Sequence, residues 1–542
     1  MEQDVAHWEL LSEVHDRLLS GCACRLSAPD EWLSLLKRTE YAQDQASTLC
    51  VLSTIQFMCE IAHESRMLGK LCPSLWSNIL TLQSELVIKS LHTFCILPQC
   101  KFRIYCGIQC MAAVANSSAE AWNSVMTLLE ERADGFQTIS TKQREIYFQL
   151  ISRLLQNVVE DTHPLGKLTV TCKSATSGSF GHSSGAPKRD IADVVRKWWN
   201  AIWSEGLRGA PYTYLQAMLS LWLRILEDCQ DMETFHELSA AWIIDTVTDA
   251  CPLLSNMCLQ VCDKGLQSVA TDPIVDVSPC VLQLAKTLIS SVEGGWLNRI
   301  QYRTEFCGFG GTVLQGRSQS EQGDENVITG DARMLRRTLL AVFKASVVHL
   351  QQGGASVPTV LHQTFQWMHL RTNKLNWTKE RIIVELFVEQ DDQLLECLHA
   401  LLLLHCAHEN DKSSKSHKGD NPVPDPHIML LLFLHSLCND HSALVDLLTS
   451  DETCALLYFV RYLKTAISNW TAFVGAHTNC SNVPDASSSM PNQFCLDDTM
   501  AVLIRLRLKL EKMFRQGLVP FNVRPLLRLL QKCECLYEGT EL

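Results

Sequence analysis

Soft metal ligands gather in one short segment, Cys397 to His408, with the sequence CLHALLLLHCAH. His405 and His408 are three residues apart, a spacing that places two side chains on one face of a helix. A structural zinc site normally takes four ligands, often as two close pairs, and this sequence has no Cys-x-x-Cys pair to supply a second half. We therefore expect no metal and no cofactor, and we interpret these side chains as buried or half-buried helix residues.

A pattern typical of hydrolases, Gly-x-Ser-x-Gly, occurs at Gly181 to Gly185 and would make Ser183 a nucleophile. The nucleophile elbow needs a buried strand before the serine and a helix directly after it. Here the pattern lies within Cys172 to Asp190, a segment rich in Ser and Gly that predicts a loop. We expect no catalytic residue, and an enzyme whose ionisable groups come together from distant parts of the chain remains an alternative.

Carboxylates are dense just before the segment of soft ligands and could serve acid–base chemistry. Asp391 and Asp392, however, directly precede the apolar run that begins at Leu394. At that place they would cap a helix and meet the positive end of its dipole. We interpret the whole group as helix punctuation: Glu385, Glu389, Asp391, Asp392 and Glu396.

A strongly basic segment lies near the end of this chain, whose formal net charge is −12. Between Thr499 and Cys533, Glu511 is the only acidic residue. Gly517 and Pro520 predict a turn between two helical patterns, and hence a helical hairpin with a basic face. That face could be solvated, dock on the acidic body, bind an acidic partner or bind nucleic acid. Its basic residues are Arg505, Arg507, Lys509, Lys512, Arg515, Arg524, Arg528 and Lys532.

Helical periodicity runs through most of the chain, and no run of alternating strands joined by hairpin turns is found. The pattern predicts an all-α protein and favours an irregular armadillo- or HEAT-like α-solenoid with a C-terminal helical hairpin. No repeat at ~34 or ~40–47 residues is evident, so an unclassified multi-helical globule stays an alternative. Helices are predicted over Ala46–Met67, Ser74–Leu97, Lys142–Val159, Ile191–Trp203, Tyr214–Leu226 and Met334–Leu350, and loops over Cys172–Asp190, Gly316–Gly330, Glu409–Pro426 and Gly475–Asn492.

The segment from Thr449 to Trp470 predicts an amphipathic helix packed on a larger helical body. Thr449 and Glu452 have the spacing of a capping box, which would start this helix. Tyr458, Arg461 and Ser468 are expected on the side away from the apolar stripe. The stripe consists of Leu456, Phe459, Val460, Leu463, Ile467 and Trp470.

Three segments follow one another in the second half of the chain: Phe387–Asp392, Glu452–Lys464, and Pro520–Asn522 with Leu526–Leu530. The middle one, ETCALLYFVRYLK, is the most specific, because its mixture of Glu, Cys, Arg and aromatic positions is not fixed by helical composition. In order and spacing these segments resemble the Lines family, over roughly residues 377 to 536. The marker residues of the resemblance are Glu452, Thr453, Cys454, Tyr458, Phe459, Arg461, Tyr462 and Lys464.

The resemblance implies an armadillo-like protein with no enzymatic activity and no catalytic residues to carry over. It implies a non-catalytic interaction or scaffold protein related to regulators of developmental, Wingless/Wnt-linked signalling or of transcription. It further implies a Lines N-terminal region over 1–473, a polar linker over 474–495 and a Lines C-terminal module over 496–538. We expect regulatory proteins as partners, with a nucleic-acid-associated factor that uses the basic hairpin as the alternative.

Composition is that of a folded protein, with 46% hydrophobic and 20% charged residues. The 24 cysteines, many within apolar helical patterns, and the charged start of the chain favour a reducing compartment. The longest apolar run, Ile428 to Leu434, is far shorter than the ~18 residues of a membrane helix. We therefore expect a soluble intracellular protein, cytoplasmic or nuclear or both, with no membrane partner.

Overall fold

A computed structural model gives the fold, and every regular element among its described residues is a helix, which confirms the all-α prediction. The predicted helices Ala46–Met67 and Ser74–Leu97 lie outside the described residues. The structure describes residues 108–109, 111–112, 115, 119–162, 186–205, 207, 209–228, 237–249, 251–271, 277–300, 332–352, 357–372, 377–412, 422–450, 452–480 and 495–540.

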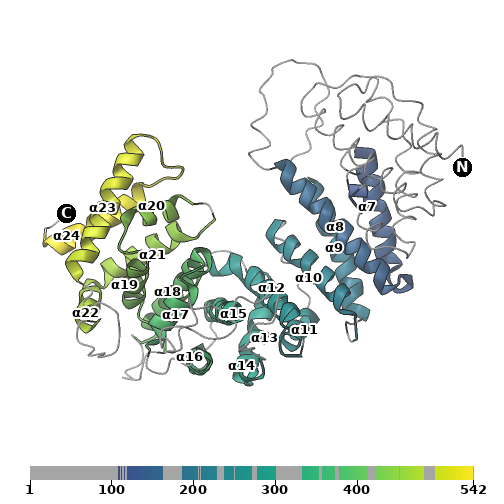
Figure 1. Cartoon of the computed structure of the whole chain (residues 1–542), viewed down its shortest axis with the longest axis horizontal. Coiled ribbons are helices and arrows are strands. Elements are labelled where there is room, and N and C mark those ends of the chain that lie inside the picture. The colour runs from purple at the N-terminus through teal and green to yellow at the C-terminus, as the bar shows by residue number, and fades with distance from the viewer. Residues whose placement is uncertain are drawn as a thin grey trace, which may run out of the picture. The chain divides into compact units, whose positions relative to one another are not determined.

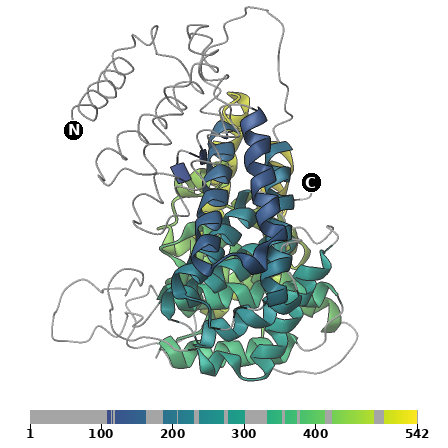
Figure 2. The same cartoon turned by 90° about the vertical axis from the view of Figure 1, so that its right-hand side faces the viewer.

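The chain divides into two compact units, Met1–His236 and Glu237–Leu542. In unit 1, α8 packs against α9 and α10, and α7 packs against α9, as the blue helices lying side by side in Figures 1 and 2 show. The three helices predicted within this part are confirmed. Unit 1 contains α7 (Ala119–Asp134), the short 3-10 helix η2 (Phe136–Thr138), α8 (Thr141–Thr162), α9 (Ala186–Glu205) and α10 (Tyr212–Asp228).

The core of unit 1 is built around aromatic side chains, with Trp198 of α9 fully buried among them. Its ring meets Phe136 and Phe148 edge to face, at centroid distances of 5.5 and 5.8 Å. The indole N–H donates to the carbonyl of Leu129 on α7 at 3.1 Å, so the polar end of this side chain is satisfied inside the core. One residue thereby joins three elements of the unit.

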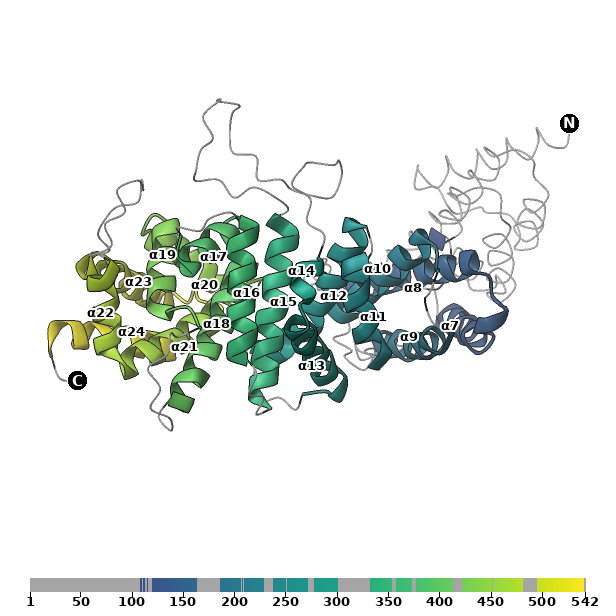
Figure 3. The same ribbon diagram turned by 90° about the horizontal axis from the view of Figure 1, so that it is seen from below.

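Unit 2 is a longer series of helices, which Figure 3 shows lying beside one another from α12 to α23. The predicted helix Met334–Leu350 is confirmed within α15. The elements are α11 (Glu237–Asp249), α12 (Pro252–Thr271), α13 (Pro279–Glu293), α14 (Trp296–Arg299), α15 (Ala332–Gln351), α16 (Val357–Thr372), α17 (Lys379–Phe387), α18 (Asp391–Lys412), α19 (Pro426–Ser436), α20 (His441–Thr449), α21 (Ala455–Ser468), α22 (Trp470–Cys480), α23 (Leu496–Arg515) and α24 (Arg524–Glu538).

In much of unit 2, a helix contacts the third helix after it. Thus α12 packs on α15, α15 on α18, α18 on α21 and α21 on α24, and the same spacing joins α13 to α16, α19 to α22 and α20 to α23. Stacked helical units of this kind form a solenoid. The five helices of the first series begin at residues 252, 332, 391, 455 and 524. These intervals exceed the ~40–47 residues of regular repeats, which is why no repeat was evident in the sequence.

A buried ion cluster, the Lys344 triad of Asp263, Lys344 and Glu396, joins three layers of this stack. Lys344 on α15 is 2% exposed, and its Nζ lies 2.5 Å from Asp263 Oδ1 on α12 and 2.8 Å from Glu396 Oε2 on α18. Burial lowers the pKa of Lys344, but the two carboxylates outweigh it, so the net shift is upward and the ammonium stays charged. Burial raises the pKa of Glu396 against the opposing effect of Lys344.

The predicted start of α21, the helix that carries most of the marker residues, is wrong. Thr449 ends α20 and donates its hydroxyl back to the carbonyl of Val445 at 2.9 Å, so it does not cap the next helix. The next helix, α21, begins at Ala455, whose amide donates to Thr453 Oγ1 at 3.4 Å. Thr453 thus accepts one of the first amides of α21, whereas the N-cap residue, Cys454, makes no side-chain capping bond.

The predicted solvent side of α21 is also partly wrong, because Tyr458 is buried, whereas Ser468 is exposed as expected. Helix α21 is covered by α18, α20, α22 and α24, so apolar burial extends well beyond one stripe. Leu456, Val460 and Ile467, which belong to the predicted stripe, are only half-buried. A single hydrophobic face does not describe a helix that has neighbours on several sides.

Three predicted loops have boundaries that differ from the structure. Helix α18 runs to Lys412, inside the predicted loop Glu409–Pro426, and α19 begins at Pro426. Helix α9 begins at Ala186, inside the predicted loop Cys172–Asp190, since Pro187 fits the first turn of a helix. Helix α22 runs to Cys480, inside the segment predicted to be polar linker.

Within the described residues, no single helix has the length and apolar content to cross a membrane. The pair α19 and α20 passes that test only together, with a bend of 105° between them.

Candidate functional site

The C-terminal hairpin, defined as α23 and α24 with the turn between them, is the predicted basic element, and its helical form is confirmed. The turn passes through Gly517 at φ +69°, a backbone conformation that glycine adopts without strain. Tyr537 Oη near the end of α24 donates to Asp497 Oδ1 near the start of α23 at 2.6 Å and ties the two ends together. Helix α23 packs on α20 and α24 packs on α21. The hairpin is therefore a further layer of the stack.

Ion pairs within the hairpin engage two of its predicted basic residues. Arg507 meets Glu534 at two points, with Nε 2.7 Å from Oε2 and Nη2 donating to Oε1 at 3.2 Å. Arg507 also donates to Glu511 at 3.3 Å, and Arg515 donates to the same carboxylate at 2.6 Å. The charges of these two arginines and two glutamates therefore offset one another. The ion pair between Arg507 and Glu534 holds α23 against α24.

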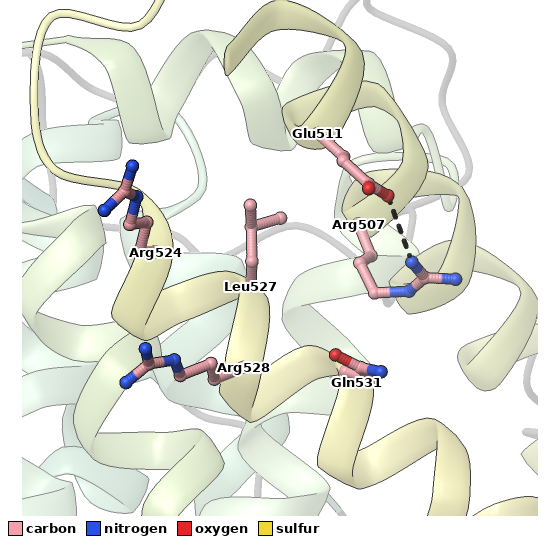
Figure 4. A pocket seen from close by; sticks show the side chains of 6 residues that line it. All are labelled: Arg507, Glu511, Arg524, Leu527, Arg528 and Gln531. Atoms are coloured by element: carbon pink, nitrogen blue, oxygen red, sulfur yellow. Dashed lines mark hydrogen bonds and ion pairs between the residues drawn. The ribbon is translucent and has the colours of Figure 1, made fainter. Parts of the chain in front are cut away.

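A shallow pocket of about 280 Å³ opens between the two helices (Figure 4). From α24, Arg524 and Arg528 stand on one side with Leu527 between them and the facing helix, while the ion-paired Arg507 and Glu511 face them from α23. The guanidinium of Arg524 lies over the ring of Phe514, 5.4 Å from its centroid. Arg524 and Arg528 form no ion pair with any residue that the structure describes, so their charges are open to a ligand. The lining residues are Arg507, Glu511, Arg524, Leu527, Arg528 and Gln531.

The remaining predicted basic residues do not line this pocket. Arg505, Lys509 and Lys512 of α23 and Lys532 of α24 are exposed, and Arg515 is exposed while paired to Glu511. The structure therefore brings three of the eight predicted residues together, at Arg507, Arg524 and Arg528. Sequence reasoning missed Glu534, which neutralises Arg507, because it lies one residue beyond the basic segment.

The marker residues of α21 hold the fold together. Arg461 Nη1 donates to His399 Nε2 on α18 at 3.0 Å, and Tyr462 Oη lies 3.0 Å from His427 Nδ1 on α19. Tyr458, Phe459 and Tyr462 are buried. Thr453 and Cys454 are half-buried at the start of the helix, and only Glu452 and Lys464 are exposed. The resemblance at this segment thus reflects packing between layers, with little surface left for a ligand.

Three buried histidines accompany α21 and its neighbours. Arginine has donors only, so His399 Nε2 must accept, and its ring is neutral. Burial lowers the pKa of His399 to about 3, and the charge of Arg461 adds to the effect. Burial likewise lowers the pKa of His427 to about 4 and lowers that of His477. On α22, His477 Nδ1 donates to the Phe473 carbonyl at 2.9 Å, while Nε2 lies 3.2 Å from Thr499 Oγ1 on α23.

The potential metal ligands of the segment Cys397–His408 contact different neighbouring residues. Cys397 is fully buried, which raises its pKa, and Cys406 Sγ lies 3.5 Å from Thr465 Oγ1 on α21. His399 faces Arg461, and His405 and His408 are half-buried, as the interpretation of these residues expected. No group of three potential ligands that could hold a metal occurs among the described residues. Ser183 and its loop lie outside the described residues.

The dense carboxylates before α18 separate into two roles. Asp391 and Asp392 lie in the first turn of α18, as predicted for helix punctuation. Glu396, in contrast, belongs to the Lys344 triad. Sequence reasoning missed the triad, although Lys344 stands alone in the apolar run between Leu339 and Val348. The signal for a buried charge was present, but its partners lie 81 residues before it and 52 after it.

Two family profiles match this chain in unit 2. The profile described as Lines N-terminus matches residues 253–477, and the one described as Lines C-terminus matches residues 499–535. The first begins within α12, so the family region extends further toward the N-terminus than the resemblance read from residue 377. The second coincides with the C-terminal hairpin.

Curated relatives agree with these profiles. The chain is 32% identical over 258 residues to Protein lines of Drosophila melanogaster, covering 42% of this chain and 28% of that protein. It is 27% identical over 251 residues to Protein Lines homolog 1 of Homo sapiens, covering 43% and 32%. The mouse homolog of the same name is 26% identical over 208 residues, covering 36% and 27%. The match thus spans a third or less of these relatives, and none of the three names is that of an enzyme.

Proposed function

The chain belongs to the Lines family through residues 253–477 and 499–535, and we propose that it is a non-catalytic interaction protein that binds an acidic segment of a regulatory partner. The binding surface is the C-terminal hairpin. The chain would work inside the cell as a regulator of developmental signalling or transcription, the role that the family resemblance implies. The polar linker and the domain boundaries at 473 and 495 stay predictions.

The observation that carries this proposal is the pair Arg524 and Arg528, two exposed arginines beside a pocket and without an acidic partner among the described residues. Exposed hydrophobic side chains on the same hairpin also support the proposal. Among the described residues, seven large hydrophobic side chains are exposed, and four of them lie on the hairpin: Leu508, Leu518, Leu536 and Tyr537. Exposed apolar groups and unpaired arginines on one helical hairpin are the composition of a protein-binding surface.

The test compares the full chain with Arg524→Glu/Arg528→Glu as bait for proteins from nuclease-treated lysate, read by mass spectrometry at low and moderate salt. Each captured protein is then expressed and its affinity for the bait measured directly. We expect at least one direct partner to lose binding about tenfold or more in the variant, because two attractive charges become repulsive. A set of partners indifferent to this change would contradict the proposal.

A matched control is available on the same hairpin. Arg505→Glu/Lys509→Glu changes the net charge by the same amount at two exposed residues that do not line the pocket. It should leave the partner's affinity nearly unchanged. If instead both variants lose binding equally, and an oligonucleotide binds the full chain with a steep salt dependence, the nucleic-acid alternative would replace the protein partner.

A further inference from the structure

The pocket of the C-terminal hairpin has a charge balance that selects among acidic ligands. Arg507 and Arg515 are held by Glu511 and Glu534, so these four residues contribute little net charge. Arg524 and Arg528 remain, with two positive charges one helical turn apart on α24. Residues at this spacing have Cβ atoms about 5–6 Å apart, which lets two guanidinium groups reach one ligand group.

Guanidinium geometry favours a phosphate over a single carboxylate here. Each arginine offers two parallel N–H donors, and a phosphate monoester offers three acceptor oxygens with a charge of about −1.5 to −2. Two arginines therefore match one phosphate in charge and in donors, whereas one carboxylate would leave one of them uncompensated. The lining contains arginine and no lysine, although Lys509, Lys512 and Lys532 lie on the same hairpin.

From this arrangement we infer that the pocket binds a phosphorylated serine or threonine in an extended segment of the partner protein. The inference rests on the proposed function, since it specifies the ligand of the same surface. The phosphate lies between Arg524 and Arg528, and the guanidinium of Arg524 also contacts the Phe514 ring. Leu527 offers an apolar contact to the residue beside the phosphorylated one, and Gln531 offers an amide to its backbone.

The size of the pocket agrees with a side chain as its occupant. At about 280 Å³ it lies just below the ~300–1,000 Å³ of sites that enclose drug-sized molecules. Two of its lining residues, Arg524 and Arg528, are exposed, so a peptide can reach it from solvent without the hairpin moving. Glu511 lies on the far wall, held by Arg507 and Arg515, and its charge would disfavour a second acidic residue at that end of the ligand.

The test measures retention of the full chain on three immobilised degenerate peptide libraries of equal composition. One library carries a fixed phosphoserine or phosphothreonine, the second the unmodified residue and the third a glutamate. We expect about tenfold or greater preference for the phosphorylated library over both others. Arg524→Gln/Arg528→Gln should abolish the preference, whereas the control Arg505→Gln/Lys509→Gln, with the same loss of charge, should keep it. Both pairs are exposed, and circular dichroism should verify that both variants fold.

Each other outcome overturns the inference. Equal retention on the phosphorylated and glutamate libraries, lost with Arg524 and Arg528, would keep the proposed binding of acidic partners and remove the preference for phosphate. Equal loss in both variants would indicate nonspecific attraction of anions by the whole hairpin. Absence of retention on every library would remove the peptide ligand, while the capture experiment above decides separately whether the hairpin binds a folded partner.

Discussion

Lys344 of α15 and Glu396 of α18 are joined by an ion pair of 2.8 Å within the helical stack, and neither side chain has more than slight contact with solvent. With Asp263 on the other side, the ammonium links three successive layers of the solenoid. The two carboxylates were brought out of water together with a single cation. Their burial is tolerated only because that cation is present.

Replacing Lys344 by Met should therefore destabilise unit 2 strongly. The change removes the cation that both buried carboxylates contact, which costs about 3–5 kcal/mol in comparable cases. The measurement is the urea midpoint of the full chain by circular dichroism, together with hydrogen exchange of α12, α15 and α18. Lys464→Met, at an exposed position on α21, is the control and should change the stability by less than about 0.5 kcal/mol. A loss below about 1 kcal/mol for Lys344→Met would contradict the role assigned to the triad.

Acid should weaken unit 2 through its buried histidines. The pKa values of His399 and His427 are lowered to about 3 and about 4, against about 6.5 in an unfolded chain. Their contribution to stability is present above pH 6.5 and is lost as pH falls toward these folded-state values, because the unfolded chain binds protons first. Each histidine contributes roughly 1.4 kcal/mol per pH unit within that window.

His399→Gln isolates one of these contributions. Glutamine supplies an oxygen that can still accept from Arg461 but cannot be protonated in this range. The free energy of unfolding should depend less steeply on pH between 7.5 and 5 than in the parent chain. The difference in slope should correspond to about one proton. His441→Gln, at a partly exposed position at the start of α20, is the control. Parallel curves for the His399 variant and the parent chain would show that folding does not change the pKa of His399.

Two glycine-to-alanine substitutions should have opposite signs. At Gly517 the backbone has φ +69°, so alanine would be strained and should destabilise the hairpin by about 1 kcal/mol. At Gly475, within α22, a Cβ meets nothing within 4 Å, and alanine should stabilise the helix by up to about 1 kcal/mol. Thermal unfolding of both variants provides the comparison. Equal effects at the two sites would contradict the conformation of the turn.

Trp198→Phe should destabilise unit 1 by about 1–3 kcal/mol. The substitution keeps an aromatic ring near Phe136 and Phe148 but removes the indole hydrogen bond to Leu129 and part of the buried ring volume, which leaves a cavity in the core. Hydrogen exchange in α7 and α9 measures the effect locally. Tyr212→Phe, at an exposed ring at the start of α10, should show none. Unchanged protection around Leu129 would mean that the indole hydrogen bond contributes little.

The sequence predicted what short-range periodicity encodes. Helices α8, α9, α10 and α15, the hairpin and its turn at Gly517 follow from apolar spacing and from glycine and proline positions within a few residues. The basic residues of the pocket were also named, since Arg524 and Arg528 lie on one helix. Properties fixed within one or two turns of chain were therefore accessible.

Properties fixed between helices were not. Tyr458 was placed toward solvent because periodicity identifies one apolar face, whereas α21 has neighbours on several sides. Arg507 is neutralised by an ion pair with Glu534, which lies 27 residues away on the facing helix. Asp263 reaches Lys344 across a gap longer than one repeat. In each case the partner is chosen by stacking of the helices, which no local pattern records.

The packing of the hairpin on the preceding layer has a consequence for inherited variation. Helices α23 and α24 cover α20 and α21. A premature stop codon between residues 481 and 495 would expose that face, including the packing around Tyr462. Cells send such chains to chaperones and proteases, so the allele would behave as a loss of the whole protein's abundance. Missense changes at Arg524 or Arg528 would instead leave the amount of protein normal.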